Sequence, residues 1–181
     1  MKFNQLPLKG AFTIDIEPNG DERGFFARVF CEREFAAAGI DFEAVQMNMS
    51  TNREKGTLRG LHYQLGDNAE QKLVRCIKGA IVDLIVDVRP QSPTFLEHVF
   101  VELSEENRRA ILVPRGFAHG IQTLTAGAEI LYLVSAFYAP GAERGLRWND
   151  PRLAIAWPLE PTVISDKDRA HPDFDPAIHL Q

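Results

Sequence analysis

Short segments in which apolar and polar residues alternate recur along this chain, a pattern typical of half-buried β-strands. The clearest segment is residues 56–64, Gly-Thr-Leu-Arg-Gly-Leu-His-Tyr-Gln. In a regular strand, Gly60, His62 and Gln64 would face one side and Arg59 the other. A titratable imidazole and an amide between glycines, which let a ligand approach closely, make this strand the first candidate for a functional site.

The same alternation predicts other strands. They cover residues 11–16, 24–30, 44–50, 95–102, 109–113, 116–124 and 129–137, with a turn at residues 18–21. Residues 72–88 form two apolar runs divided by Gly79, which predicts a β-hairpin. A short helix is expected over residues 31–39, ending at Gly39, with weaker helical signals near Ser104 and Asp150.

Many short strands with turn signals at roughly ten-residue intervals predict a mainly β fold. The fold class is therefore an antiparallel jelly-roll (cupin-like) barrel with a few short helices. Residues 1–181 are expected to form one domain. Its last stretch, residues 161–181, is rich in proline and aspartate and is expected to run irregularly over the surface.

Composition narrows the function classes. Hydrophobic residues at 45% and charged residues at 25% are ordinary for a globular protein. A net charge of −5 argues against a nucleic-acid or anionic-membrane surface but permits a local basic pocket. Cys31 and Cys76 form neither a disulfide framework nor a zinc spacing. The sequence shows no signal-peptide region and no membrane-length apolar run, so a cytoplasmic location is expected.

A jelly roll raises the possibility of a metal-binding cupin, which needs two histidines one residue apart, then a glutamate and a later histidine. His62 supplies the first imidazole and His119 the last, but Gln64 stands where the second is required. The ammonium of Lys72 would also repel a cation in this pocket. We therefore predict a site without metal, the alternative being that His62 is only a buried structural histidine.

Several cations lie on candidate strands of the same barrel, so that some must converge on its interior. Arg59, Lys72 and the two histidines suit an anionic ligand such as a phosphate or diphosphate. Arg75 and Lys78 are interpreted instead as solvated strand charges.

Two more residues are ambiguous by themselves. Tyr132 lies in an apolar run, where core packing and a functional role are both open. Asp168 would by default be a turn or helix-start aspartate.

Seven motifs, spread in order over residues from about 10 to 170, resemble those of the dTDP-4-dehydrorhamnose 3,5-epimerase family. They are Asp-Glu-Arg-Gly-Phe-Phe from Asp21, the strand from Gly56, Lys-Leu-Val-Arg from Lys72, Val-Pro-Arg-Gly-Phe-Ala-His-Gly from Val113, Phe-Tyr-Ala-Pro from Phe137, Arg-Trp-Asn-Asp-Pro from Arg147 and Ser-Asp-Lys-Asp from Ser165. The resemblance implies cofactor-independent 3,5-epimerisation of dTDP-4-dehydro-6-deoxy-D-glucose to dTDP-4-dehydro-L-rhamnose.

The resemblance also implies roles for individual residues. His62 would be the base, Asp168 its carboxylate partner, Lys72 the cation beside the C4 oxygen and Tyr132 the acid on the opposite face. Residues implied to bind the nucleotide, diphosphate or sugar are Arg23, Phe26, Gln46, Asn48, Arg59, His119, Tyr138, Glu143 and Lys167. Tyr138 would stack on the nucleotide base. No metal or cofactor is implied.

The family's homodimers exchange N-terminal strands, so Arg23 and Phe26 would serve the neighbouring subunit's pocket. Two departures concern nucleotide binding. Arg28 stands where rhamnose-pathway members commonly have glutamate, and residues 46–52 differ from the sequence usual in those members. A single-site (3- or 5-) epimerase on another 4-keto nucleotide sugar, or a non-catalytic sugar-nucleotide binder, is the alternative.

The resemblance creates one geometric conflict. It places both Arg59 and His62 near the ligand, whereas a regular strand would direct them to opposite faces. We therefore expect a bulge or twist around Gly60.

Overall fold

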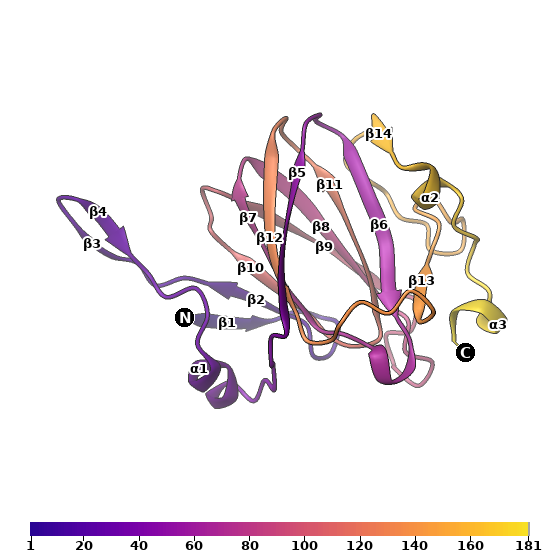
Figure 1. Ribbon diagram of the computed structural model, residues 1–181, viewed down its shortest axis with the longest axis horizontal. Coiled ribbons are helices and arrows are strands. Elements are labelled where there is room, and N and C mark those ends of the chain that lie inside the picture. Colours follow the sequence, from indigo (N-terminus) through magenta and orange to yellow (C-terminus); the bar gives the residue numbers. More distant parts are fainter. Residues whose placement is uncertain (181) are drawn as a thin grey trace.

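Two stacked sheets form the body of the protein, as the computed structural model shows for residues 1–180 (Figure 1). The first sheet has the order β1 (Lys2–Gln5), β2 (Phe12–Asp15), β10 (Ala110–Val113), β7 (Lys72–Lys78), β12 (Ala128–Val134) and β5 (Gln46–Asn52). The second has the order β13 (Glu143–Gly145), β6 (Thr57–Gln64), β11 (Phe117–Thr123), β8 (Ala80–Asp87) and β9 (His98–Ser104), with β14 (Val163–Ile164) parallel to β6. The predicted mainly β, antiparallel jelly-roll class is confirmed.

The main core lies between these two sheets, where the inward residues of both interdigitate. Val74 and Ile111 come from the first sheet, and Ile81, Ile85 and Ile121 come from the second. All five are buried. This layer holds the two sheets together.

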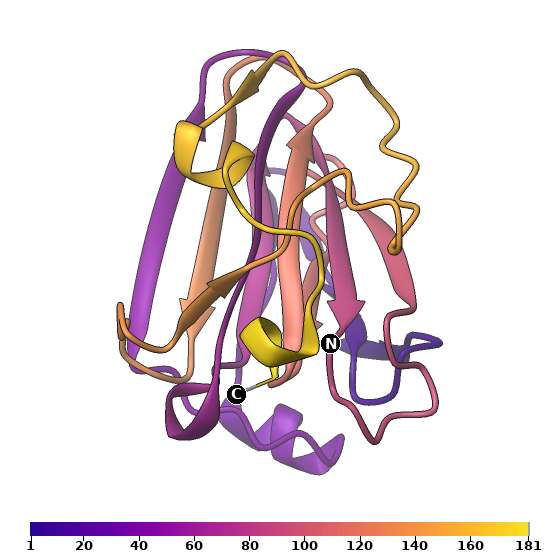
Figure 2. The same cartoon turned by 90° about the vertical axis from the view of Figure 1, so that its right-hand side faces the viewer.

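The outer face of the second sheet is covered by the C-terminal stretch (Figure 2). Leu84, Val86 and Leu146 are buried there together with Phe174 from that stretch. This cover explains why β8 is apolar on both faces instead of alternating. The stretch predicted to be irregular contains β14 and two short helices, α2 (Asp166–Arg169) and α3 (Pro176–His179). Gln181, its last residue, lies outside the described range.

The outer face of the first sheet is partly covered by α1 (Glu32–Ala37), whose Phe35 packs on Leu73 and Leu112. Gly39 adopts a φ of +75° just after this helix, as expected for a helix-ending glycine. The helix predicted over residues 31–39 is confirmed.

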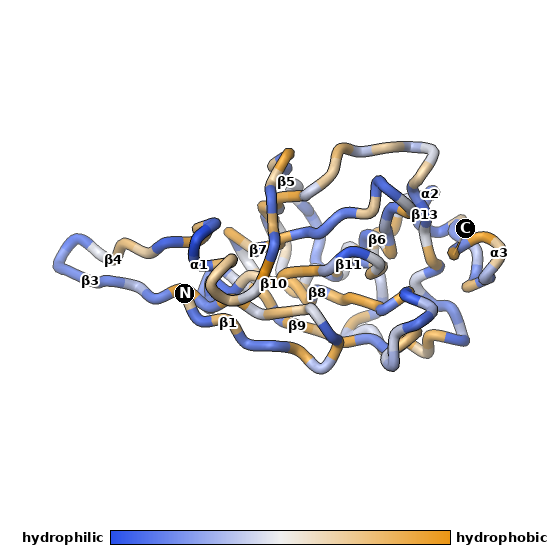
Figure 3. The backbone as a smooth tube through the Cα atoms, turned by 90° about the horizontal axis from the view of Figure 1, so that it is seen from below, coloured by the Kyte–Doolittle hydropathy of each residue, from blue (hydrophilic) through white to orange (hydrophobic). Residues whose placement is uncertain are grey.

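A separate two-stranded hairpin, β3 (Asn19–Asp21) and β4 (Gly24–Phe26), projects away from the body (Figure 1). Its β3 arm is mainly hydrophilic, while the strands inside the body are rich in hydrophobic residues (Figure 3). In residues 1–180, β3 and β4 pair only with each other.

Four local predictions are wrong. Gly79 does not form a hairpin: β7 pairs with β10 and β12, whereas β8 pairs with β9 and β11, so the chain crosses between sheets at this glycine. The turn predicted at residues 18–21 is largely strand β3, and the strand predicted over residues 24–30 ends at Phe26. The helical signals near Ser104 and Asp150 correspond to turns, because short polar runs there close loops without continuing as helices. A short 3₁₀ turn at Gly66–Asn68 was not predicted.

Strand β6 contains the expected irregularity. Its His62 lies opposite His119, and its Arg59 lies opposite Ile121, so three steps along β6 match two steps along β11. This extra residue is a β-bulge at Gly60–Leu61. It reverses the alternation, so Arg59 and His62 line the same cavity.

In the described part of the chain, no helix has both the length and the hydropathy that crossing a bilayer requires.

The bulge predicts a strict requirement for glycine at residue 60. Gly60 has a φ of +116°, and a Cβ there would lie 2.6 Å from Gly120 Cα and 2.7 Å from the His119 carbonyl oxygen. We expect Gly60→Ala to lower the free energy of unfolding by at least ~2 kcal/mol, measured by urea denaturation. The matched control is Gly141→Ala, since a Cβ at Gly141 meets no atom within 4 Å. Equal stabilities of the two variants would contradict the close approach of β6 and β11.

Candidate active site

Two adjoining cavities open between the sheets and share His62, Lys72 and Tyr132 among their lining residues. The first, about 340 Å³, also contains Arg59 and is called the Arg59 cavity. The second, about 280 Å³, is lined in addition by Gln46, Asn48, Gln64, Glu70, Tyr138 and Glu143, and is called the Tyr138 cavity. A larger hollow of about 550 Å³ lies beside α1, but no histidine, tyrosine or basic residue lines it. The acid–base groups therefore converge on the shared part of the first two cavities.

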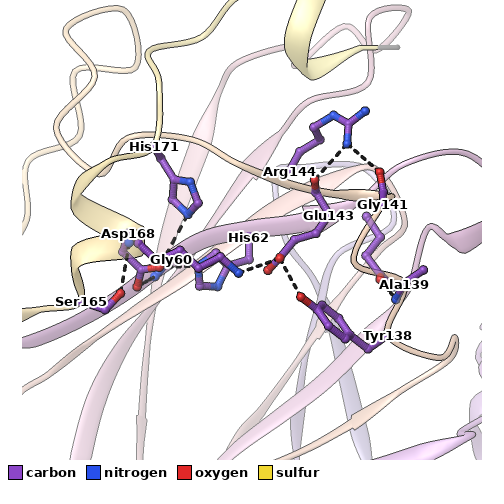
Figure 4. A network of polar contacts seen from close by, with 12 residues as sticks. Gly60, His62, Tyr138, Ala139, Gly141, Glu143, Arg144, Ser165, Asp168 and His171 are labelled. Atoms are coloured by element: carbon purple, nitrogen blue, oxygen red, sulfur yellow. Dashed lines mark hydrogen bonds and ion pairs between the residues drawn. The ribbon is translucent and has the colours of Figure 1, made fainter.

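His62 and Asp168 form a hydrogen-bonded dyad (Figure 4). The His62 Nε2 and Asp168 Oδ1 atoms are 2.7 Å apart, and Asp168 Oδ2 accepts a hydrogen bond from the Gly60 N–H at 3.1 Å. Burial alone would raise the pKa of the Asp168 carboxyl, but the hydrogen bond from His62 and its charge hold that pKa below the usual value. Asp168 therefore stays ionised and fixes the imidazole with Nε2–H toward it, which leaves Nδ1 to accept a proton.

The local fold explains how Asp168 reaches β6. Strand β14 pairs in parallel with the start of β6, and α2 begins immediately afterwards. The Ser165 hydroxyl accepts a hydrogen bond from the Asp168 N–H at 3.1 Å, capping this short helix. The default interpretation of Asp168 as a helix-start residue was therefore correct locally, but its side chain also enters the cavity.

Lys72, at the start of β7, is mostly buried and lies 3.0 Å from Glu70 Oε1. Glu70 also accepts a hydrogen bond from the Gln64 side chain at 2.8 Å. Gln64 Oε1 in turn accepts from the Ala139 N–H at 2.6 Å. Gln64, which stands where a metal-binding cupin has a histidine, thus anchors the loop that carries Tyr138. It also positions Glu70, the partner of Lys72.

Tyr132 comes from β12 in the first sheet, whereas His62 comes from β6 in the second. Burial, followed by the negative charge of Glu70, raises the pKa of the Tyr132 hydroxyl, so this group is protonated at neutral pH. A ligand in the shared cavity would therefore have an imidazole on one wall and a phenol on the other.

His119 lies directly across from His62 on β11, but the two imidazoles have different carboxylate partners. His119 Nε2 is 2.8 Å from Asp83 Oδ2, and Asp83 is fully buried in β8. Burial raises the pKa of the Asp83 carboxyl, and the neighbouring His119 opposes that rise. His119 is thereby fixed in the wall of the Arg59 cavity, which His62 also lines.

The far end of the Tyr138 cavity is an exposed polar cluster (Figure 4). Tyr138 donates a hydrogen bond to Glu143 at 2.9 Å, and Lys167 forms a 2.6 Å ion pair with the same carboxylate oxygen. The Tyr138 N–H donates to Gln46 Oε1 at 3.3 Å. Arg59 lies at the opposite end and donates to Asn52 Oδ1 at 2.6 Å. A long ligand could therefore extend from Arg59 past the dyad to Tyr138.

Two of the proposed binding residues do not reach these cavities in one copy of the chain. Arg23 is in the turn of the projecting hairpin with its side chain 85% exposed, and Phe26 is 76% exposed on β4. Arg28 lies just beyond the hairpin, 3.0 Å from Glu34. The other predicted site residues line the cavities or, for Lys167, contact one that does.

The interpretation of Arg75 as a solvated charge is wrong. Its Nη1 is buried without a hydrogen-bond partner among the described residues, and burial lowers the pKa of its guanidinium. Strand β7 turns this side chain toward Val29 in the segment after the hairpin. Lys78, by contrast, is exposed and pairs with Glu129 at 3.3 Å, as predicted.

Sequence reasoning missed three residues of the site: Glu70, Asp83 and His171. Asp83 had a signal, since it is a carboxylate in the middle of an apolar run, where a charge requires a partner. Glu70 lies in a loop, and its contact with Lys72 depends on how that loop folds. His171 lies next to the dyad, with Nε2 3.6 Å from Asp168 Oδ1 and its ring edge-on to His62. Burial, followed by the charge of His62, lowers the pKa of the His171 imidazole.

Comparison with known proteins identifies the family. The family model described as dTDP-4-dehydrorhamnose 3,5-epimerase matches residues 5–176. The chain belongs to this family. A relative named dTDP-4-dehydrorhamnose 3,5-epimerase from Sinorhizobium fredii is 45% identical over 175 residues, which are 96% of this chain and 90% of the relative.

Two solved structures extend the comparison. The dTDP-4-dehydrorhamnose 3,5-epimerase of Bacillus anthracis, with TDP and PPi bound, has a TM-score of 0.93 and 39% identity, covering 96% of this chain and 99% of its own. A 3′-monoepimerase from Streptomyces bikiniensis, in complex with dTDP-quinovose, has a TM-score of 0.87 and 35% identity, covering 94% and 86%. The resemblance found in the seven motifs is thus confirmed at the level of family and fold.

Proposed function

We propose that this chain converts dTDP-4-dehydro-6-deoxy-D-glucose into dTDP-4-dehydro-L-rhamnose by inverting C3 and C5. The observation that carries the proposal is the placement of His62 and Tyr132 on opposite sheets, facing one cavity that Lys72 of β7 also lines. Inversion beside a ketone requires a base on one face and an acid on the other. The family and the 45% identity to a named 3,5-epimerase support the same reaction.

The proposed chemistry uses only side chains of this site. Nδ1 of His62 takes the proton from the sugar carbon, and the imidazolium that results is stabilised by ionised Asp168. The electron pair moves onto the C4 oxygen, where the Lys72 ammonium stabilises the enolate. Tyr132 then donates its proton to the opposite face of the carbon. These proton transfers need neither a metal nor a redox cofactor.

Binding of the nucleotide is proposed to extend over both cavities. Gln46, Asn48, Tyr138, Glu143 and Lys167 form the Tyr138 end, where the exposed aromatic ring can stack on the base. Arg59 and His119 form the other end. Arg23 and Phe26 are proposed to come from a second copy. A nucleotide sugar as substrate agrees with the cytoplasmic location expected from the sequence.

A single-site epimerase is the second candidate, because the 3′-monoepimerase from Streptomyces bikiniensis shares 35% of aligned residues with this chain. A non-catalytic binder is less well supported, since such a protein has no need for both a base and an opposed acid.

Proton exchange distinguishes these candidates. After incubation with the 4-keto nucleotide sugar in deuterated water, we expect deuterium at both C3 and C5, measured by NMR and mass spectrometry. Label at one carbon alone would identify a single-site epimerase. If neither C3 nor C5 took up deuterium, catalysis would be contradicted altogether.

Variants of His62 and Tyr132 should distinguish the role of the base from the role of the acid. We expect His62→Ala to slow exchange at both carbons by at least ~10²-fold, because the general base is removed. Tyr132→Phe should retain exchange but impair inversion, because protons then return only from the His62 face. Calorimetric titration with dTDP serves as the control, since both variants should still bind the nucleotide. Undiminished inversion by His62→Ala would contradict the assignment.

The exposed apolar surface supports a homodimer. Met47 and Met49 on β5 are 65% and 63% exposed, and they lie beside Leu133 and Leu131 of β12 on the outer face of the first sheet. Phe25 and Phe26 add further exposed apolar area on the hairpin. Such a surface is typical of an interface. We propose that the hairpin of each subunit completes the pocket of the other.

Mixing two variants tests this exchange. The double variant Arg23→Ala/Phe26→Ala and the variant His62→Ala should each be nearly inactive alone. Coexpression should restore about one quarter of the wild-type sites, because random pairing yields mixed dimers in which one pocket has an intact His62 and an intact partner hairpin. Absence of restoration in mixed dimers, identified by light scattering and mass spectrometry, would contradict the exchange.

A further inference from the structure

Three potential metal ligands converge beside the cavities in an arrangement different from the cupin pattern. One ligand atom each of His62, Asp168 and His171 lies within 4.8 Å of the other two. Asp168 Oδ1 is 2.7 Å from His62 Nε2 and 3.6 Å from His171 Nε2. His62 comes from β6, while the other two residues come from α2 and the residues after it. His119 and Gln64 take no part.

His171 is held in place by close packing. Its side chain is 12% exposed, and the ring lies against Gly145, where a Cβ would be only 2.1 Å from His171 Cε1. The His171 Nε2 atom is buried and has no hydrogen-bond partner among the described residues. A buried polar atom without a partner is costly unless something binds it. The structure thus presents an imidazole nitrogen to Asp168 and His62 without using it.

We propose that His62, Asp168 and His171 form a binding site for a late first-row divalent ion such as Zn²⁺. Ligands at the usual Zn–N and Zn–O distances are about 3.4 Å apart in a tetrahedral site. The three ligand atoms need small side-chain rotations to reach that spacing. The Arg59 cavity, which His62 and Asp168 both line, leaves a fourth position open to water. Two imidazoles and one carboxylate favour zinc over magnesium or calcium.

The charge around the site permits a cation. Lys72 is paired with Glu70 at 3.0 Å, and Lys167 is paired with Glu143 at 2.6 Å. Within residues 1–180, the basic groups in direct contact with the Asp168 carboxylate are the imidazoles of His62 and His171. The repulsion expected from Lys72 is therefore offset by Glu70.

A bound ion would inhibit the enzyme, a consequence that rests on the proposed function. Coordination through His62 Nε2 requires the proton on that nitrogen to move to Nδ1, with no net proton released. Nδ1 then has no lone pair to accept a proton from the sugar, and Asp168 is engaged by the metal instead of by His62. Metal binding and proton abstraction thus compete for one imidazole.

Direct binding tests the site independently of catalysis. Full-length protein stripped with EDTA is titrated with ZnCl₂ by calorimetry, and Co²⁺ is used as a spectroscopic probe. We expect one ion per chain in the wild type and at least ~10-fold weaker binding in His171→Phe, which keeps a flat ring against Gly145 but has no ligand atom. His171→Asn provides a second variant in case the larger ring disturbs packing. His98→Gln is the matched control, since His98 lies on β9, away from the dyad, and should not change binding.

Activity is then measured on the same samples. Zinc should inhibit deuterium incorporation by the wild type, EDTA should reverse the inhibition, and each His171 variant should lose zinc sensitivity relative to its own zinc-free rate. No zinc binding by the wild type, or equal binding by wild type and both His171 variants, would overturn the site, whatever the activity. His171-dependent binding by a protein without epimerase activity would support the site and contradict the proposed function.

Discussion

The carboxylate of Asp168 is the constraint on which the geometry of the site depends. One oxygen accepts from the His62 ring, and the other accepts from the Gly60 N–H within the bulge of β6. The same side chain therefore fixes the orientation of the imidazole and contacts the irregularity that brings Arg59 to the same cavity. Strand β14 and the Ser165 cap hold Asp168 in this position. Removing the C-terminal stretch would leave the His62 imidazole without its carboxylate partner.

The two-sheet architecture supplies the second requirement of the chemistry, which is access to both faces of a substrate carbon. A single sheet presents side chains to a ligand from one side, whereas Tyr132 and His62 approach from two. Burial and neighbouring groups set the protonation states of two site residues: Asp168 stays ionised and Tyr132 stays protonated. The core residues between the sheets keep these walls at a constant separation.

Local patterns failed at particular points for physical reasons. The apolar runs on either side of Gly79 suit a hairpin equally well as two strands of different sheets, since both place apolar residues inward. Arg75 looks like an exposed strand charge, but the segment after the hairpin covers it. The contacts of Glu70 and His171 join residues from loops and a short helix, where periodicity carries no information about direction.

The sequence by itself determined the β class and strand β6, because alternation is a local property. Its motifs also determined the family, and that resemblance nominated His62, Lys72, Tyr132 and Asp168 as site residues. It also required the bulge at Gly60, since two ligand-facing residues fell on opposite faces of a regular strand. Only the tertiary structure decided which sheet each strand joins, that His119 pairs with Asp83, and that His171 lies beside the dyad. These depend on contacts between residues distant in the chain, which packing selects and no local pattern encodes.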